Sequence, residues 1–183
     1  DTLTGGGGAG TLVQVGNQPI ARAYATDFAT PPGTLGPVLV VLQAPMPANG
    51  TVQAIQYFNQ ATNGSSPNPS AGNLFHAYVL RAASVANEYT VAWDSGELTV
   101  PPTTDPVGVI ESITVPNIPV TANDRIAFYG EGIPLDAGGG TDILSYPAPA
   151  APTGTVALGG ASFPVYSQDR TYSIAASVVD MSA

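Results

Sequence analysis

The residues best suited to chemistry in this sequence are three acids in a glycine-rich stretch. Glu131, Asp136 and Asp142 lie within a dozen residues, and residues 138–141 add several flexible carbonyl groups. Calcium prefers six to eight oxygen ligands, mostly from carboxylates and carbonyls. The spacing differs from that of an EF-hand, so the pattern predicts a loop-type Ca²⁺ site on Glu131, Asp136 and Asp142. A plain acidic loop is the alternative interpretation.

Catalytic patterns are weaker. His76 is the only histidine and no Gly-x-Ser-x-Gly turn occurs, which disfavours both a Ser-His-Asp triad and a histidine-based zinc site. Asp94-Ser95-Gly96 is similar to the loop of aspartic proteases, but those enzymes need two carboxylates and the motif occurs once. Carboxylate pairs for glycoside hydrolysis stay open, and no pair stands out. The sequence therefore predicts a protein that is not an enzyme and has no certain cofactor.

Aromatic residues suggest a second function. Eight tyrosines, five phenylalanines and one tryptophan are enough for a sugar-stacking surface if two or three line up on one exposed face. Residues 118–126, Ile-Pro-Val-Thr-Ala-Asn-Asp-Arg-Ile, resemble the turn and strand of jelly-roll accessory modules in secreted microbial proteins. A secreted carbohydrate-binding module, with optional Ca²⁺, is therefore the alternative hypothesis. Asn49 and Asn63 each begin a glycosylation sequon.

Composition restricts the partners. The 183 residues include 13 acids, four arginines and no lysine, for a net charge of −9, so nucleic acids and anionic membrane surfaces are poor partners. The longest apolar run, 38–42, is far shorter than the roughly 18 residues of a membrane span. The absence of cysteine excludes disulfides and thiolate metal sites. The lysine-free chain has few tryptic cleavage sites and begins at Asp1, so we expect a processed protein that is extracellular or on a cell or virion surface.

A shortage of charge favours self-assembly. Only 9% of residues are charged, against roughly 25% in typical soluble domains, and interface cores are depleted in Lys, Glu and Asp. The run 38–42 is apolar on both faces, so either it is buried on both sides or its second face meets a partner. The primary hypothesis is a structural protein that forms a filament, sheath, surface layer or virion shell. Its N-terminal strand would pair with its own domain or dock on a neighbouring copy through Leu3, Leu12, Val13 and Val15.

Short runs of β-branched and aromatic residues between turn clusters predict an all-β fold without significant helix. We expect strands at 11–15, 19–28, 36–43, 51–59, 74–82, 88–93, 97–100, 107–115, 124–130, 155–158 and 171–179. Asn49-Gly50 predicts a tight hairpin, and Asp94-Ser95-Gly96 predicts a second with Gly96 in the left-handed conformation. About ten short strands indicate one β-sandwich domain at 16–183, of jelly-roll type, preceded by a glycine-rich arm at 1–15.

Overall fold

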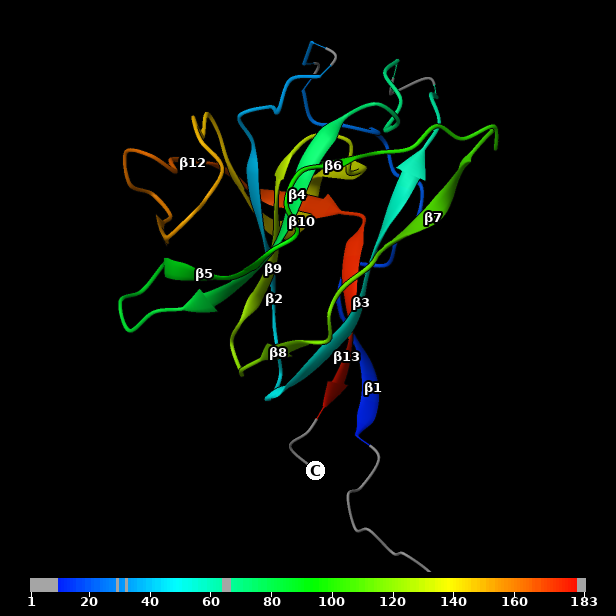
Figure 1. The fold of residues 1–183 in the computed structure, drawn as a ribbon. Helices are drawn as coiled ribbons and strands as arrows, with labels where there is room; N and C mark the ends of the chain where they lie inside the picture. The colour runs from blue at the N-terminus through cyan, green and yellow to red at the C-terminus, as the bar shows by residue number, and fades with distance from the viewer. Residues whose placement is uncertain (1–9, 29, 32, 64–66, 181–183) are drawn as a thin grey trace, which may run out of the picture.

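The protein is a β-sandwich (Figure 1). The computed structural model describes residues 10–28, 30–31, 33–63 and 67–180. These residues form thirteen strands in two antiparallel sheets and no helix. The predicted all-β sandwich is thus confirmed, and its jelly-roll topology stays a prediction.

The two sheets differ in size. Sheet A has five strands, in the order β1 (Thr11–Gly16), β13 (Ile174–Asp180), β3 (Gly50–Gln60) and β7 (Gly108–Ile113), with β8 (Ile118–Val120) also on β3. Sheet B has eight, in the order β11 (Thr155–Ala157), β5 (Glu88–Asp94), β4 (Leu74–Ala82), β9 (Arg125–Gly130), β2 (Leu39–Pro45), β10 (Leu135–Ser145) and β12 (Val165–Tyr172), with β6 (Leu98–Thr99) also on β4. The chain passes repeatedly from one sheet to the other.

The central strands of sheet B, β2, β4 and β9, are buried on both faces. The inward side chains of this sheet, such as Val40 and Phe75, join those of sheet A in the inner core. Its outward side chains join residues of the segment 146–164 in a second group, the outer cluster: Leu39, Val41, Tyr78, Leu80, Tyr89, Ala127, Tyr129, Ala148, Val156 and Phe163. The run 38–42 is therefore apolar on both faces because its own chain covers both, without any partner molecule.

The predicted strand at 19–28 is wrong. Within it, the structure has only an isolated bridge between Tyr24 and Leu135. The neighbouring backbone groups are satisfied by side chains: the Arg22 and Ala23 amides donate to Gln60 Oε1 and Asp136 Oδ1, at 2.7 and 3.0 Å. These acceptors replace a strand ladder, and residues 17–28, here called the strap, run beside residues 131–142.

The glycine-rich stretch holds the main missed element. Strand β10 passes through it and pairs with β12, with register shifts between Ala137 and Asp142. Gly138 and Gly139 lie there with φ of 101° and 78°, values that side chains other than glycine rarely adopt. Glycines that look like a loop in the sequence thus form an irregular stretch of one long strand.

Neither predicted hairpin forms, because the strands on the two sides of each turn do not pair with each other. Asn49-Gly50 joins β2 of sheet B to β3 of sheet A, so the chain changes sheets there. Asp94-Ser95-Gly96 lies between β5 and β6, which both pair with β4 along the same edge. Gly96 does adopt the predicted left-handed conformation, with φ of 75°.

Two neighbouring substitutions test the two-sided burial. Val40 lies in the inner core and Val41 in the outer cluster, and both are fully buried. We expect Val40→Ala and Val41→Ala each to lower the free energy of unfolding by about 1–3 kcal/mol, because each leaves a cavity. Val85→Ala, at a side chain in the β4–β5 turn that is 56% exposed, is the control and should change it by less than about 0.5 kcal/mol. Denaturant titration measures all three, and a silent Val41→Ala would contradict the covering by residues 146–164.

Candidate functional site

The three acids predicted to bind calcium each hold a different part of the strap. Asp142 accepts hydrogen bonds from Asn17 Nδ2 at 2.7 Å and from the amides of Gln43 and Tyr172, both at 3.1 Å. It therefore ties the start of the strap to β2 and β12.

The other two acids hold the middle and the end of the strap. Asp136 accepts from Arg22 Nη1 and from the Ala23 amide, both at 3.0 Å. Glu131 Oε2 accepts from Thr26 Oγ1 at 2.7 Å and from the Phe28 amide at 3.2 Å. All these partners lie more than 100 positions away in the sequence.

The structure does not bring the three carboxylates together. No three His, Asp or Glu side chains in the described part of the chain gather into a group that could hold a metal ion. Glu131 and Asp142 are buried, whereas the Asp136 side chain is 44% exposed and forms an ion pair with Arg22. The expected shared Ca²⁺ site on Glu131, Asp136 and Asp142 is therefore not formed by these side chains, because neighbouring donors engage each one separately.

A fourth acid that the sequence did not single out lies beside Glu131. The Asp27 side chain is 4% exposed, accepts a short hydrogen bond from the Tyr172 hydroxyl, and lies 4.0 Å from Arg170 Nη1. Burial raises the pKa of Asp27 to about 6 against the opposing effects of Tyr172 and Arg170. Burial also raises the pKa of Glu131 to about 8, with a further increase from Asp27.

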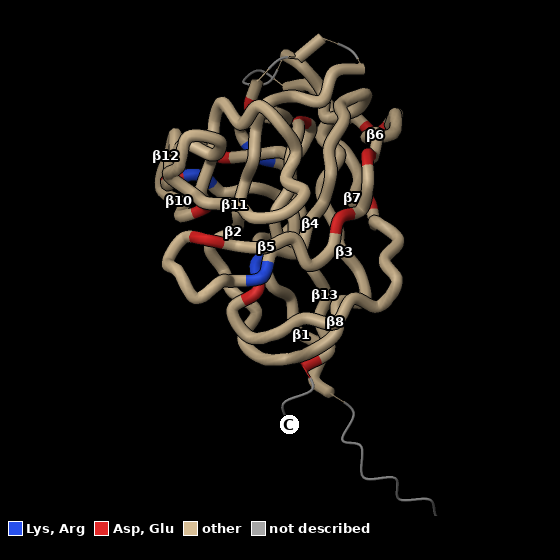
Figure 2. Tube along the Cα trace, turned by 60° about the vertical axis from the view of Figure 1, so that its left-hand side comes forward, with Lys and Arg blue, Asp and Glu red and all other residues tan. Residues whose placement is uncertain are grey.

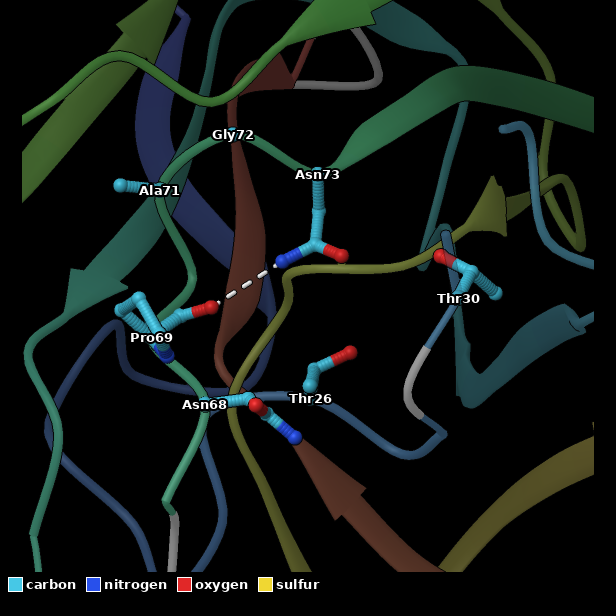
Figure 3. A pocket seen from close by; sticks show the side chains of 7 residues that line it. All are labelled: Thr26, Thr30, Asn68, Pro69, Ala71, Gly72 and Asn73. Carbon is cyan, nitrogen blue, oxygen red and sulfur yellow. Dashed lines mark hydrogen bonds between the residues drawn. The ribbon is translucent and has the colours of Figure 1, made fainter. Parts of the chain in front are cut away.

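A cleft with neutral side chains lies beside the strap. The cleft in Figure 3 has a volume of about 190 Å³ and is lined by Thr26, Thr30, Asn68, Pro69, Ala71, Gly72 and Asn73. None of these residues is charged, and Asn73 Nδ2 donates to the Pro69 and Ser70 carbonyls at 3.0 and 2.9 Å. The cleft therefore has no evident acid, base or nucleophile.

His76 has a partner that the sequence did not reveal. Its Nδ1 lies 2.9 Å from Asp94 Oδ1, which reproduces two members of a Ser-His-Asp triad. The nearby Ser95 hydroxyl donates to the Gly96 carbonyl at 2.7 Å and accepts from the Ala77 amide at 2.9 Å. Ser95 thus has a structural role in the turn, and the pair has no identified nucleophile.

The three predicted docking residues that the structure describes, Leu12, Val13 and Val15, do not form one surface. Strand β1 pairs with β13 of the same chain from Thr11 to Gly16. Val15 is buried in the inner core and Val13 packs against it, whereas Leu12 is 63% exposed. Leu3 lies outside the described residues. Of these four residues, only Leu12 is shown to be accessible for docking.

Leu12 belongs to an open surface, the outer face of sheet A. Strand alternation, pairing and burial place one set of side chains on this face. Its exposed and half-buried members are Leu12, Gln14, Thr51, Gln53, Ala54, Gln56, Ile110, Ser112, Pro119, Ser177 and Val179. A hydrogen bond of 3.1 Å from Gln56 Nε2 to Ser112 Oγ crosses this face. None of these eleven residues is charged.

Each of the four arginines binds a group of its own chain. Arg22 pairs with Asp136, Arg81 with Asp124 and Arg170 with Asp27 and Asp169. Arg125 Nη1 donates to the Leu42 carbonyl at 3.3 Å. Charged positions are sparse along the whole trace (Figure 2).

Comparisons with known proteins assign no family. No protein-family model, curated protein or solved structure matches the chain. In the described part of the chain, no helix is long and apolar enough to span a membrane. Functional inference therefore depends on the surfaces and cavities themselves.

The raised pKa of Glu131 predicts that stability falls as pH rises. The folded protein keeps this proton up to about pH 8, whereas the unfolded chain loses it near the ordinary value of 4.5. The folded state thus binds more protons between these values, and its stability declines as pH increases through them. We expect Glu131→Gln to raise the melting temperature by several degrees at about pH 9 and by much less at about pH 5.

Thermal unfolding at both pH values provides the measurement. The exposed Glu97 offers a matched control, and Glu97→Gln should leave the pH dependence as in the unchanged protein. An equal effect of Glu131→Gln at both pH values would contradict the raised pKa.

Proposed function

We propose that this protein is a non-enzymatic structural protein that assembles with copies of itself through the outer face of sheet A. The observation that carries the proposal is the lack of any charged side chain on this face, in a chain with a net charge of −9. Copies of so acidic a chain repel one another wherever acids face acids. They can approach most closely where the contact surface has no charge.

The composition of the face suits an interface between copies. Its side chains are small, aliphatic or amide-bearing, and the cores of protein interfaces are depleted in Asp, Glu and Lys. The central strands of sheet B offer no equivalent surface, because the segment 146–164 covers their outer side. A second copy seated on sheet A would cover the sandwich in the way that residues 146–164 cover sheet B.

One edge of sheet A extends this surface. Strand β1 lies at the edge, with no described strand on its far side, and contains neither a charge nor a proline. Proteins normally protect exposed edges with such residues, as Pro119 does on β8. Leu12 lies where the open edge meets the outer face, so it contributes to docking without Val13 and Val15.

The assembled protein would be a subunit of a filament, sheath, surface layer or virion shell, located outside the cell or on a cell or virion surface. All four arginines bind groups of their own chain, which supports a partner other than nucleic acid. The jelly-roll arrangement is part of the same proposal.

New charge on the outer face should prevent assembly. Gln53 is exposed and Ser177 half-buried, on adjacent strands in the middle of sheet A. We expect the unchanged protein to form oligomers or polymers. Gln53→Glu with Ser177→Glu should shift dissociation to at least about tenfold higher protein concentration, because facing copies then repel. Mass photometry and light scattering after size exclusion measure the change.

Two further variants make this test specific. Ser84→Glu, at an exposed position in the β4–β5 turn, adds negative charge elsewhere and should leave assembly unchanged. A chain without residues 1–9 keeps β1 intact and tests those nine residues separately. The proposal fails if the unchanged protein stays an 18.5 kDa monomer, or if only removal of residues 1–9 prevents assembly.

A further inference from the structure

A second cavity lies between the strap and the edge of sheet B formed by β10 and β12. Its volume is about 140 Å³, and its lining includes Tyr24, Asp27, Phe28 and Arg170. It combines two aromatic rings with a carboxyl group and a guanidinium group. Binding pockets typically have apolar walls with a few convergent polar groups of this kind.

Aromatic rings continue from this cavity along the surface. Phe28 stacks on Tyr146, with ring centroids 4.3 Å apart and an interplanar angle of 16°. The Tyr166 ring meets both edge-on, at centroid distances of 5.7 Å from Tyr146 and 6.3 Å from Phe28. Tyr166 is 57% exposed and Tyr24 42%, so both present accessible rings.

The polar groups of the cavity complement hydroxyl groups. Arg170 supplies N–H donors, and its side chain is 17% exposed. The Asp27 carboxyl lies deeper, at 4% exposure, and accepts hydrogen bonds when ionised. Neighbouring hydroxyls of a sugar can accept from the guanidinium and donate to the carboxylate.

We propose that Tyr24, Asp27, Phe28, Tyr146, Tyr166 and Arg170 form a binding site for a neutral carbohydrate. One pyranose ring stacks its C–H face on Tyr166, because the face of an aromatic ring is electronegative. The next sugar along the chain places its hydroxyls toward Arg170 and Asp27. This site shares no residue with the outer face of sheet A, so it is independent of self-assembly.

Other ligand classes fit less well. An aromatic cage for a quaternary ammonium ion needs rings around an open space, whereas Phe28 and Tyr146 are stacked on each other. Arg170 also opposes a cation in the cavity. An anionic ligand would meet the Asp27 carboxyl and the net charge of −9.

The test is calorimetric titration of the 183-residue chain with neutral oligosaccharides. The probes are cellohexaose, xylohexaose, mannohexaose and N-acetylated chitohexaose, with tetramethylammonium as the cationic alternative. We expect one of the oligosaccharides to bind, and Tyr166→Ala to weaken that binding by at least about tenfold. Tyr166→Phe keeps the stacking ring and should bind within about threefold of the unchanged protein.

Control variants separate loss of the site from loss of the fold. Val85→Ala removes a side chain that is 56% exposed, in the β4–β5 turn, and should not change binding. Thermal unfolding of each variant checks that it is folded. The proposal is overturned if no oligosaccharide binds, if only tetramethylammonium binds, or if Tyr166→Ala binds sugar as well as the unchanged protein does.

Discussion

Burial of the central strands of sheet B on both faces is the constraint on which the rest of the structure depends. One face of the sheet packs in the inner core, where Val40 lies, and the other face packs in the outer cluster, where Val41 lies. A sheet of this kind needs a second cover in addition to its partner sheet. Residues 146–164 provide that cover, and Tyr129 fastens it by donating from its hydroxyl to the Ala148 carbonyl at 2.5 Å. The long segment between β10 and β12 therefore stabilises the fold by covering the outer cluster.

Three acidic side chains stabilise this architecture through hydrogen bonds to the strap. Glu131, Asp136 and Asp142 hold the strap, which is neither helix nor strand and so lacks a ladder of its own. Burying a carboxyl group is costly unless donors compensate it, and these acids receive backbone and side-chain donors. At Glu131 the compensation is incomplete, because Oε1 is buried without a partner. Its raised pKa follows from that environment.

Two accessible surfaces of the protein differ in chemical character. The outer face of sheet A has no charged side chain, which suits contact with another copy. The cavity beside β10 and β12 presents exposed aromatic rings next to Arg170 and Asp27, which suits hydroxyl-rich ligands. The two surfaces share no residue. Assembly through sheet A would therefore leave the cavity accessible on every copy.

The all-β class and many of the strands could be predicted from the sequence, because alternation of side chains is a local property. The strand at 74–82 has its predicted bounds, and the predicted run at 124–130 corresponds to β9 at 125–130. Which elements contact one another depends on the folded chain and was not predictable from local patterns. At Asn49-Gly50 the chain passes from sheet B to sheet A instead of closing a hairpin, and the glycine-rich stretch is part of strand β10. The same limit applies to the sites: the acids were visible at 131, 136 and 142, but each accepts from a donor in the strap that lies more than 100 positions away. Local spacing predicted a shared metal ion there, whereas the contacts that determine the role of each carboxylate exist only after the chain has folded.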